Sequence, residues 1–98
     1  IVDDMITTAG TLCNAAELIK KKGAKKIWAA VTHGIFTEGA LEKIIASPIE
    51  KILVTDTIPQ RKEVSDCPKV EVISVAPLLA EAIERIHSGD SLSEKLFR

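Results

Sequence analysis

Residues that could recognise a charged ligand gather within the first eleven positions. Residues 1–2 are interpreted as the end of a buried strand, residues 3–11 as the loop after it, and a helix is expected to follow at once. The first backbone N–H groups of a helix lack an internal acceptor, and the helix dipole adds partial positive charge there. A glycine lets backbone approach a ligand closely, and threonine hydroxyls donate readily to phosphate. The predicted anion site comprises Thr7, Thr8, Ala9, Gly10 and Thr11.

Two acids, Asp3 and Asp4, precede the anion-binding residues. A carboxylate beside a phosphate would repel it, so both acids are expected to hold something else. An ionised carboxylate accepts the adjacent hydroxyl groups of a ribose, and it can also bind a Mg²⁺ ion that contacts a phosphate oxygen. Two acids followed by a Gly/Thr loop therefore suggest a sugar-phosphate site. The alternative, left open by the spacing, is an Asp-rich turn in which Thr8 or Thr11 caps the helix.

Three short apolar runs are expected to form the strands that follow. Residues 27–31 are almost continuously apolar, which is typical of a strand covered on both faces of a parallel sheet. Residues 52–54 form the next buried strand. Residues 70–73 form a last short strand with one polar position, which favours a place at the edge of the sheet. The expected fold is therefore an α/β domain with a parallel sheet.

Polar residues follow each of these strands at its carboxyl end. Ligands of open α/β sheets bind at that edge, so residues 3–11, 32–36 and 55–59 are expected to meet there. His33 lies among them, either as a residue at the rim of the site or as an ordinary loop histidine.

Apolar residues recur at helical spacing between the strands. Gly23 and Gly89 are expected to end the first and last helices, and residues 59–68 are expected to be a polar connection. The tail residues Leu92, Leu96 and Phe97 are expected to need a partner surface. The inward-facing helical residues are expected to be Leu12, Ala15, Ala16 and Ile19, then Leu41, Ile44 and Ile45, and finally Leu79, Ala82, Ile83 and Ile86.

Composition excludes several classes of protein. Apolar residues make up 46% of the 98 residues and charged residues 28%, which suits a small globular domain. A net charge of −1 and three aromatic residues provide neither the field nor the stacking surface for nucleic acid. No apolar run is long enough to span a bilayer. Cys13 and Cys67 lack metal-ligand spacing, so no metal site is expected from them, and reduced thiols in a cytoplasm are expected.

Several stretches together resemble the C-terminal part of ribose-phosphate pyrophosphokinases, which have the type I phosphoribosyltransferase fold. The first is DDMITTAGT at residues 3–11, which is similar to the phosphoribosyl-pyrophosphate loop of that fold. The others are THGIF at residues 32–36, VTDTIP at 54–59, LAEAIERIH at 79–87, and the serines and apolar residues near the end of the chain. The resemblance covers nearly all 98 residues.

The resemblance implies a partial domain of a three-layer α/β/α, type I phosphoribosyltransferase-like fold, with residues 1–98 as its C-terminal part. The implied reaction transfers a diphosphoryl group from ATP to ribose 5-phosphate and requires Mg²⁺, whose ligands are expected mostly outside this stretch. Asp3 and Asp4 then match the acids at the ribose hydroxyls, and residues 7–11 match the loop around the 5-phosphate. No residue here is a convincing general base, so no catalytic residue is assigned.

Ser91 and Ser93 match serines that line an allosteric site between subunits in regulated members of the family. Turn and cap chemistry is an equally good interpretation of both serines. Two features depart from the family: Thr7 stands where synthetases commonly have an acid, and the tail is one residue longer than usual. A homo-oligomer is implied, with neither nucleic acid nor membrane as a partner.

Three alternatives remain. A phosphoribosyltransferase would use the same loop to bind phosphoribosyl pyrophosphate. A non-catalytic relative that packs into synthetase oligomers tends to have an altered loop, whereas this chain keeps both acids, Gly10 and Thr11. The third is a folded half-domain with a residual phosphate site. The chain opens in mid-strand without methionine and contains no ATP-binding loop, so it is expected to be part of a longer protein and inactive alone.

Overall fold

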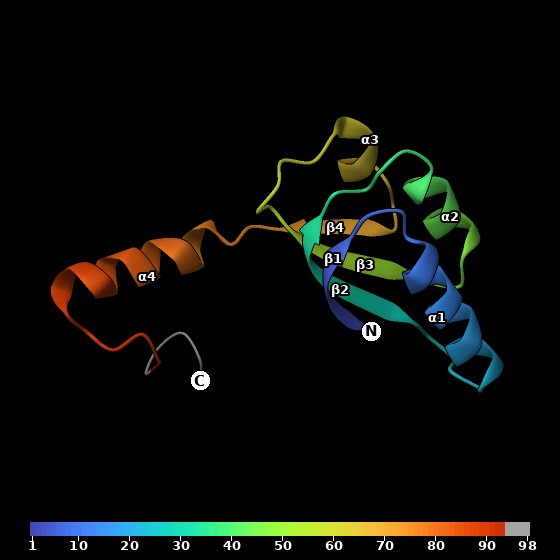
Figure 1. Ribbon diagram of the computed structural model, residues 1–98, viewed down its shortest axis with the longest axis horizontal. Helices are drawn as coiled ribbons and strands as arrows, with labels where there is room; N and C mark the ends of the chain where they lie inside the picture. Colours follow the sequence, from blue (N-terminus) through green and yellow to red (C-terminus); the bar gives the residue numbers. More distant parts are fainter. Residues whose placement is uncertain (94–98) are drawn as a thin grey trace.

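The computed structural model describes residues 1–93, in which strands and helices alternate along the chain (Figure 1). Each helix follows the strand of the same number. The elements are β1 (Val2–Ile6), α1 (Gly10–Lys21), β2 (Trp28–Gly34), α2 (Ala40–Ala46), β3 (Lys51–Thr55), α3 (Lys62–Ser65), β4 (Val70–Ile73) and α4 (Ala76–Ser88).

The four strands form one parallel sheet in the order β1-β2-β3-β4. Parallel strands cannot be joined by a tight turn, which is why each pair is linked through a helix. Ile6 at the end of β1 lies beside Gly34 at the end of β2, and Thr55 at the end of β3 lies beside Ile73. The predicted parallel α/β fold is confirmed, and so is the predicted edge position of β4.

The core lies between one face of the sheet and the helices α1 to α3. Alternate strand residues such as Val31, Ile52 and Val54 are almost completely buried, together with Ile44 of α2 and Val64 of α3. This is the period-two pattern of strands with one covered face. On α1, the predicted inward residues Leu12 and Ala16 are buried, together with Cys13, whereas the assignment of Ile19 is wrong, because that side chain is 36% exposed at the last turn of the helix.

The other face of the sheet is open within residues 1–93. Trp28 is 53% exposed and Ile73 48% exposed, and Val2 is 87% exposed. A shallow apolar groove of about 230 Å³ crosses this face, lined in part by Leu53 and Ala30. The sequence predicted a strand covered on both faces, but in the described residues the packed helices cover only one.

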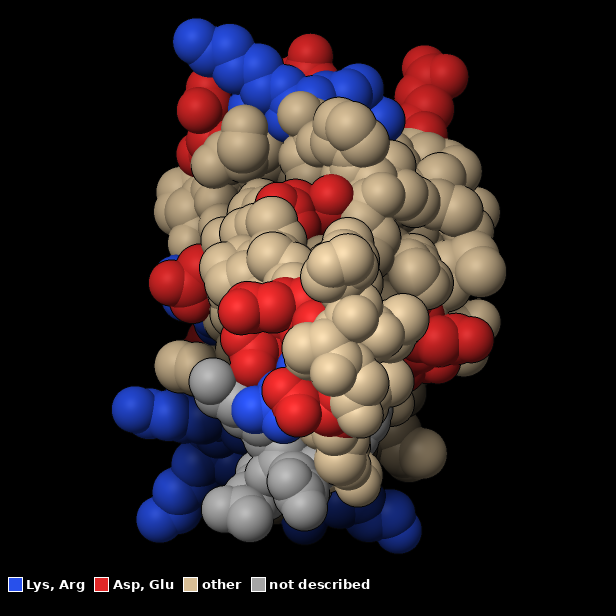
Figure 2. All heavy atoms as spheres, turned by 90° about the vertical axis from the view of Figure 1, so that its left-hand side faces the viewer, with Lys and Arg blue, Asp and Glu red and all other residues tan. Residues whose placement is uncertain are grey.

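Helix α4 also packs less than the sequence predicted. Its residues Leu79, Ile83 and Ile86 are 55%, 68% and 69% exposed, and no residue of the helix is buried. The helix projects away from the sheet (Figure 1). Seen from that end, acidic side chains are scattered over the surface, and most lysines and arginines lie toward its top and bottom (Figure 2). The inward-facing assignment for α4 is therefore wrong for the described residues.

Some boundaries also differ from the predictions. The connection at residues 59–68 contains the short helix α3, and the predicted inward residue Ile45 is 57% exposed. The predicted helix ends are confirmed: Gly23 and Gly89 have φ values of +105° and +80°, which L side chains rarely adopt. No helix within residues 1–93 is long and apolar enough to cross a membrane. Leu96 and Phe97 lie outside the described residues.

Candidate functional site

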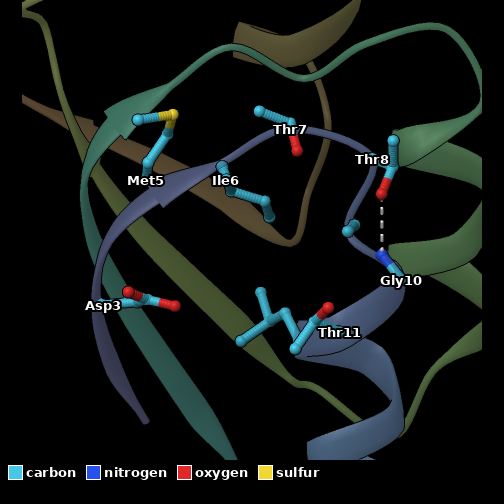
Figure 3. A pocket seen from close by; sticks show the side chains of 9 residues that line it. Asp3, Met5, Ile6, Thr7, Thr8, Gly10 and Thr11 are labelled. Atoms are coloured by element: carbon cyan, nitrogen blue, oxygen red, sulfur yellow. Dashed lines mark hydrogen bonds between the residues drawn. The ribbon is translucent and has the colours of Figure 1, made fainter.

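A cavity of about 210 Å³ lies where β1 passes into α1 (Figure 3). Its wall comes from three consecutive pieces of chain: the strand, its three-residue connection and the first turn of the helix. The lining residues are Asp3, Met5, Ile6, Thr7, Thr8, Ala9, Gly10, Thr11 and Leu12. All five residues of the predicted anion site, and one of the two predicted acids, therefore line a single cavity.

The start of α1 leaves several backbone N–H groups without a protein acceptor. The first helical hydrogen bond runs from Cys13 N to Ala9 O at 2.9 Å. Within residues 1–93, the N–H groups of Thr8, Ala9, Thr11 and Leu12 donate to no protein oxygen. These donors and the positive end of the helix dipole lie beside the cavity, so it is suited to an anion.

The alternative in which Thr8 or Thr11 is the N-cap is wrong. The N-cap residue is Ala9, whose φ of 68° places it in the left-handed region, and no side chain caps the helix. Thr8 Oγ1 accepts a long hydrogen bond of 3.4 Å from Gly10 N, drawn in Figure 3. Within residues 1–93, no protein acceptor therefore competes with a ligand for the remaining amides.

Asp3 and Asp4 lie within β1, not in a loop. Successive strand residues point to opposite faces of a sheet. Asp3 accordingly lines the cavity and points toward the first turn of α1, whereas Asp4 is not among the lining residues (Figure 3). Asp3 Oδ1 accepts the N–H of Asp4 at 2.8 Å and keeps its other oxygen free of that bond. The assignment of both acids to a loop is wrong; the sugar-binding role of Asp4 stays a prediction.

The segment after β2 supports the connection between β1 and α1. Ile35 N donates to Ile6 O and Thr37 N to Thr7 O, both at 2.9 Å. The residue between them, Phe36, is fully buried and has a φ of 47°. Residues 3–11 and 32–36 therefore meet at one edge of the sheet, as predicted.

His33 contacts the end of β3 rather than the cavity. Its Nδ1 lies 2.8 Å from Thr57 Oγ1, and the side chain does not line the cavity. This contact confirms that residues 55–59 reach the same edge as residues 32–36. A role for His33 in ligand binding stays a prediction.

Asp56, in the same polar segment, holds the start of the last helix. The Ser74 hydroxyl and the Val75 N–H both donate hydrogen bonds to the Asp56 carboxylate. They lower the pKa of Asp56 below its ordinary value of 3.8, and the Ser74 hydroxyl has the larger effect. The Val75 N to Asp56 Oδ1 distance is 2.9 Å. Because a hydrogen bond to the charged form favours that form, Asp56 is ionised at neutral pH.

Ser91 and Ser93 lie beyond α4, at the other end of the molecule from the cavity (Figure 1). Their hydroxyl oxygens are 3.1 Å apart, and Arg85 Nη1 donates to Ser91 O at 3.0 Å. The structure brings the two serines together after the helix. The allosteric role stays a prediction.

Metal ligands are sparse in the described part of the chain. No three His, Cys, Asp or Glu residues within residues 1–93 gather in a way that could hold a metal ion. Asp3 is the single carboxylate that lines the cavity. A Mg²⁺ ion commonly takes only one or two carboxylates together with phosphate oxygens and water, so the donor set suits an ion that arrives with a phosphate ligand.

Comparison with known proteins finds relatives along the whole chain. The family described as phosphoribosyl synthetase-associated domain matches residues 1–98. A ribose-phosphate pyrophosphokinase from Aquifex aeolicus is 52% identical over 93 residues, which cover 95% of this chain and 29% of the relative. Another, from Burkholderia pseudomallei, is 49% identical over 92 residues, which cover 94% of this chain and 29% of the relative.

Solved structures with the same fold include that of a synthetase. It is a crystal structure of phosphoribosylpyrophosphate synthetase from Mycobacterium smegmatis, with a TM-score of 0.83 and 34% identity. The match covers 90% of this chain and 29% of that one. The chain thus spans less than a third of the length of each of these relatives.

Proposed function

Because the chain belongs to the phosphoribosyl synthetase-associated domain family, we propose that it is part of a ribose-phosphate diphosphokinase. Such an enzyme transfers a diphosphoryl group from ATP to the anomeric hydroxyl of ribose 5-phosphate, giving phosphoribosyl pyrophosphate and AMP. In this proposal, residues 1–98 supply the ribose 5-phosphate site, and ATP is held by residues outside them.

The observation that supports this proposal most strongly is the set of unpaired amides beside the cavity. The N–H groups of Thr8, Ala9, Thr11 and Leu12 donate to no protein acceptor within residues 1–93. A phosphate has several oxygens that accept such donors, and charge-assisted hydrogen bonds are roughly twice as strong as neutral ones. We therefore propose that the 5-phosphate binds against the first turn of α1.

Asp3 is placed at the sugar. Its carboxylate lies on β1, across the cavity from the first turn of α1 (Figure 3). There it can accept hydroxyl donors of the ribose while remaining apart from the phosphate, which would repel it. Binding the phosphate and the hydroxyls at opposite sides fixes the orientation of the sugar, and orientation is the main contribution expected of a site for phosphoryl-type transfer.

Mg²⁺ fits this arrangement as a companion of the phosphate groups. Asp3 would be its one ligand from this part of the chain, and the bound ion would neutralise the charge that develops on the transferred group. The proposal also includes a second sugar contact by Asp4 and an allosteric site at Ser91 and Ser93. It further includes a homo-oligomeric assembly and a cytoplasmic location.

The test uses the full-length gene product, because the 98 residues alone are expected to be inactive. Incubation with ATP, Mg²⁺ and ribose 5-phosphate should release AMP. Release of diphosphate from phosphoribosyl pyrophosphate in the presence of a nucleobase, with no AMP formed from ribose 5-phosphate, would instead establish a phosphoribosyltransferase.

Two variants test the assignment of residues within the site. Gly10→Val places a branched side chain beside the phosphate position and should abolish ribose 5-phosphate binding. Asp3→Asn should weaken ribose 5-phosphate while leaving inorganic phosphate or sulfate binding unchanged. If Asp3→Asn weakens both ligands equally, the division between a sugar end and a phosphate end is incorrect.

A further inference from the structure

The segment that supports the anion site is itself held by two side chains at the entrance to α3. Gln60 Nε2 donates to Gly34 O at 2.8 Å, and Arg61 Nη2 donates to Phe36 O at 2.8 Å. Neither Gln60 nor Arg61 lines the cavity. Neither residue therefore contacts a ligand in the cavity, and their hydrogen bonds act on the backbone between β2 and α2.

Each of these hydrogen bonds falls on a peptide group that also contacts the site. The carbonyl of Gly34 and the N–H of Ile35 belong to the same peptide group, and that N–H donates to Ile6 O at 2.9 Å. The carbonyl of Phe36 and the N–H of Thr37 likewise share a peptide group, and that N–H donates to Thr7 O at 2.9 Å.

A peptide group is planar and rigid. A side chain that fixes its carbonyl therefore also fixes the direction of its N–H. A peptide group that accepts one hydrogen bond also becomes a better donor for the next, because hydrogen bonds in series polarise one another. Gln60 thus aims the Ile35 N–H at Ile6, and Arg61 aims the Thr37 N–H at Thr7.

The segment needs this support because its own backbone is strained. Phe36 has a φ of 47°, an uncommon value for a bulky residue, and its ring is fully buried. Such conformations persist only when the surroundings fix them. The Arg61 hydrogen bond falls on the peptide group directly after the strained residue, 36–37, and the Gln60 hydrogen bond falls on peptide group 34–35, one residue before it.

We propose that Gln60 and Arg61 are positioning residues for the anion site. Through the peptide groups 34–35 and 36–37 they set where Ile6 and Thr7 lie relative to the first turn of α1, and so the shape of the cavity. The ligand named in the test below rests on the function proposed above; the positioning role itself rests only on the geometry.

The variants are chosen to remove the hydrogen bonds while keeping the volume of the side chains. Gln60→Glu replaces the donating amide by an acceptor of nearly the same shape, and Arg61→Met removes the guanidinium but keeps an apolar stem. Glu63→Gln is the matched control: it breaks the 3.2 Å ion pair of Arg61 with Glu63 without touching the bond to Phe36 O.

The first measurement is steady-state kinetics of the full-length gene product. Each positioning variant should raise the KM for ribose 5-phosphate by about two- to tenfold, the range expected for one net hydrogen bond. The KM for ATP should not change, and Glu63→Gln should leave both values within about twofold. A general loss of folding would reduce the active fraction without this selective rise, which would count against the proposal.

The second measurement does not depend on the proposed activity. In the same protein, the backbone amides of Ile35 and Thr37 should exchange with solvent faster in Gln60→Glu and Arg61→Met, respectively, by up to about tenfold. Unchanged exchange in both variants would overturn the positioning role. Absence of AMP formation by the wild type would overturn the proposed function and leave the exchange result to decide the positioning role.

Discussion

A methyl group added at Gly34 would overlap two buried side chains. A Cβ at this position would lie 2.5 Å from Phe36 Cε2 and 2.6 Å from Val54 Cγ2. Carbon atoms pack optimally at about 3.5–4.0 Å, so both contacts are about 1 Å too short. Phe36 and Val54 are 0% and 1% exposed, so neither side chain can move into solvent. Gly34→Ala must therefore displace the core or the backbone.

Overpacking of this kind destabilises by about 1–3 kcal/mol, and the two contacts place Gly34→Ala near 3 kcal/mol. At about 4–8 °C per kcal/mol for a domain of this size, the Tm should fall by roughly 12–24 °C. Thermal and urea unfolding followed by circular dichroism measures both quantities. A free energy of unfolding within about 0.5 kcal/mol of wild type would refute the packing argument.

The control is the same substitution at another glycine. A Cβ at Gly10 meets only Thr8 Oγ1, at the ordinary distance of 3.6 Å. Alanine is also a better helix former than glycine, by up to about 1 kcal/mol. Gly10→Ala should therefore be neutral or slightly stabilising, so any loss of phosphate affinity in this variant reports a clash with the ligand and not a damaged fold.

Three further outcomes follow from single side chains. Lys69 donates to three carbonyl oxygens at the end of α2, at 3.0, 3.0 and 3.2 Å, so Lys69→Met should lower the free energy of unfolding by about 1–2 kcal/mol. Lys62 is exposed, so the control Lys62→Met should change the free energy of unfolding by less than about 0.5 kcal/mol, and equal losses for the two variants in urea unfolding would contradict this difference. The pKa of Asp56 is lower in the folded state than its ordinary value of 3.8, so its stabilising effect should be present above that pH and lost as the pH falls through the folded pKa. Asp56→Asn should remove this part of the dependence of the free energy of unfolding on pH, and an unchanged dependence would count against the assignment. Asp3→Asn should leave the Tm within about 2 °C of wild type, because the side chain is exposed and its one bond is to the neighbouring N–H, as differential scanning fluorimetry would test.

Much of the scaffold could be predicted from the sequence. Residues 70–73 were predicted as a strand and form β4, and glycines were predicted to end α1 and α4. These features depend on the properties of a few neighbouring residues, such as an apolar run for a strand and a glycine for the end of a helix. The family resemblance read from the motifs is confirmed by relatives about 50% identical to the chain.

The errors arose where tertiary pairing overrides local preference. Asp3 and Asp4 are poor strand formers, which favours a loop, but pairing with β2 extends β1 through Ile6. A strand then separates the two acids to opposite faces. The support from Gln60 and Arg61 could not be predicted either, because it depends on how two peptide groups are turned in space. A polar connection is the only signal that these residues give in the sequence.

The open face of the sheet gives the chain an optical probe of its own. Trp28 is the sole tryptophan in the sequence and is half exposed on β2. It is two residues from Ala30, which lines the open face, so both lie on the same face of the sheet. Indole emission moves to shorter wavelength when water is excluded from around the ring. The emission wavelength of the unmodified protein therefore shows directly whether this apolar surface is covered. If it stays exposed to solvent, the surface could self-associate as the protein concentration rises.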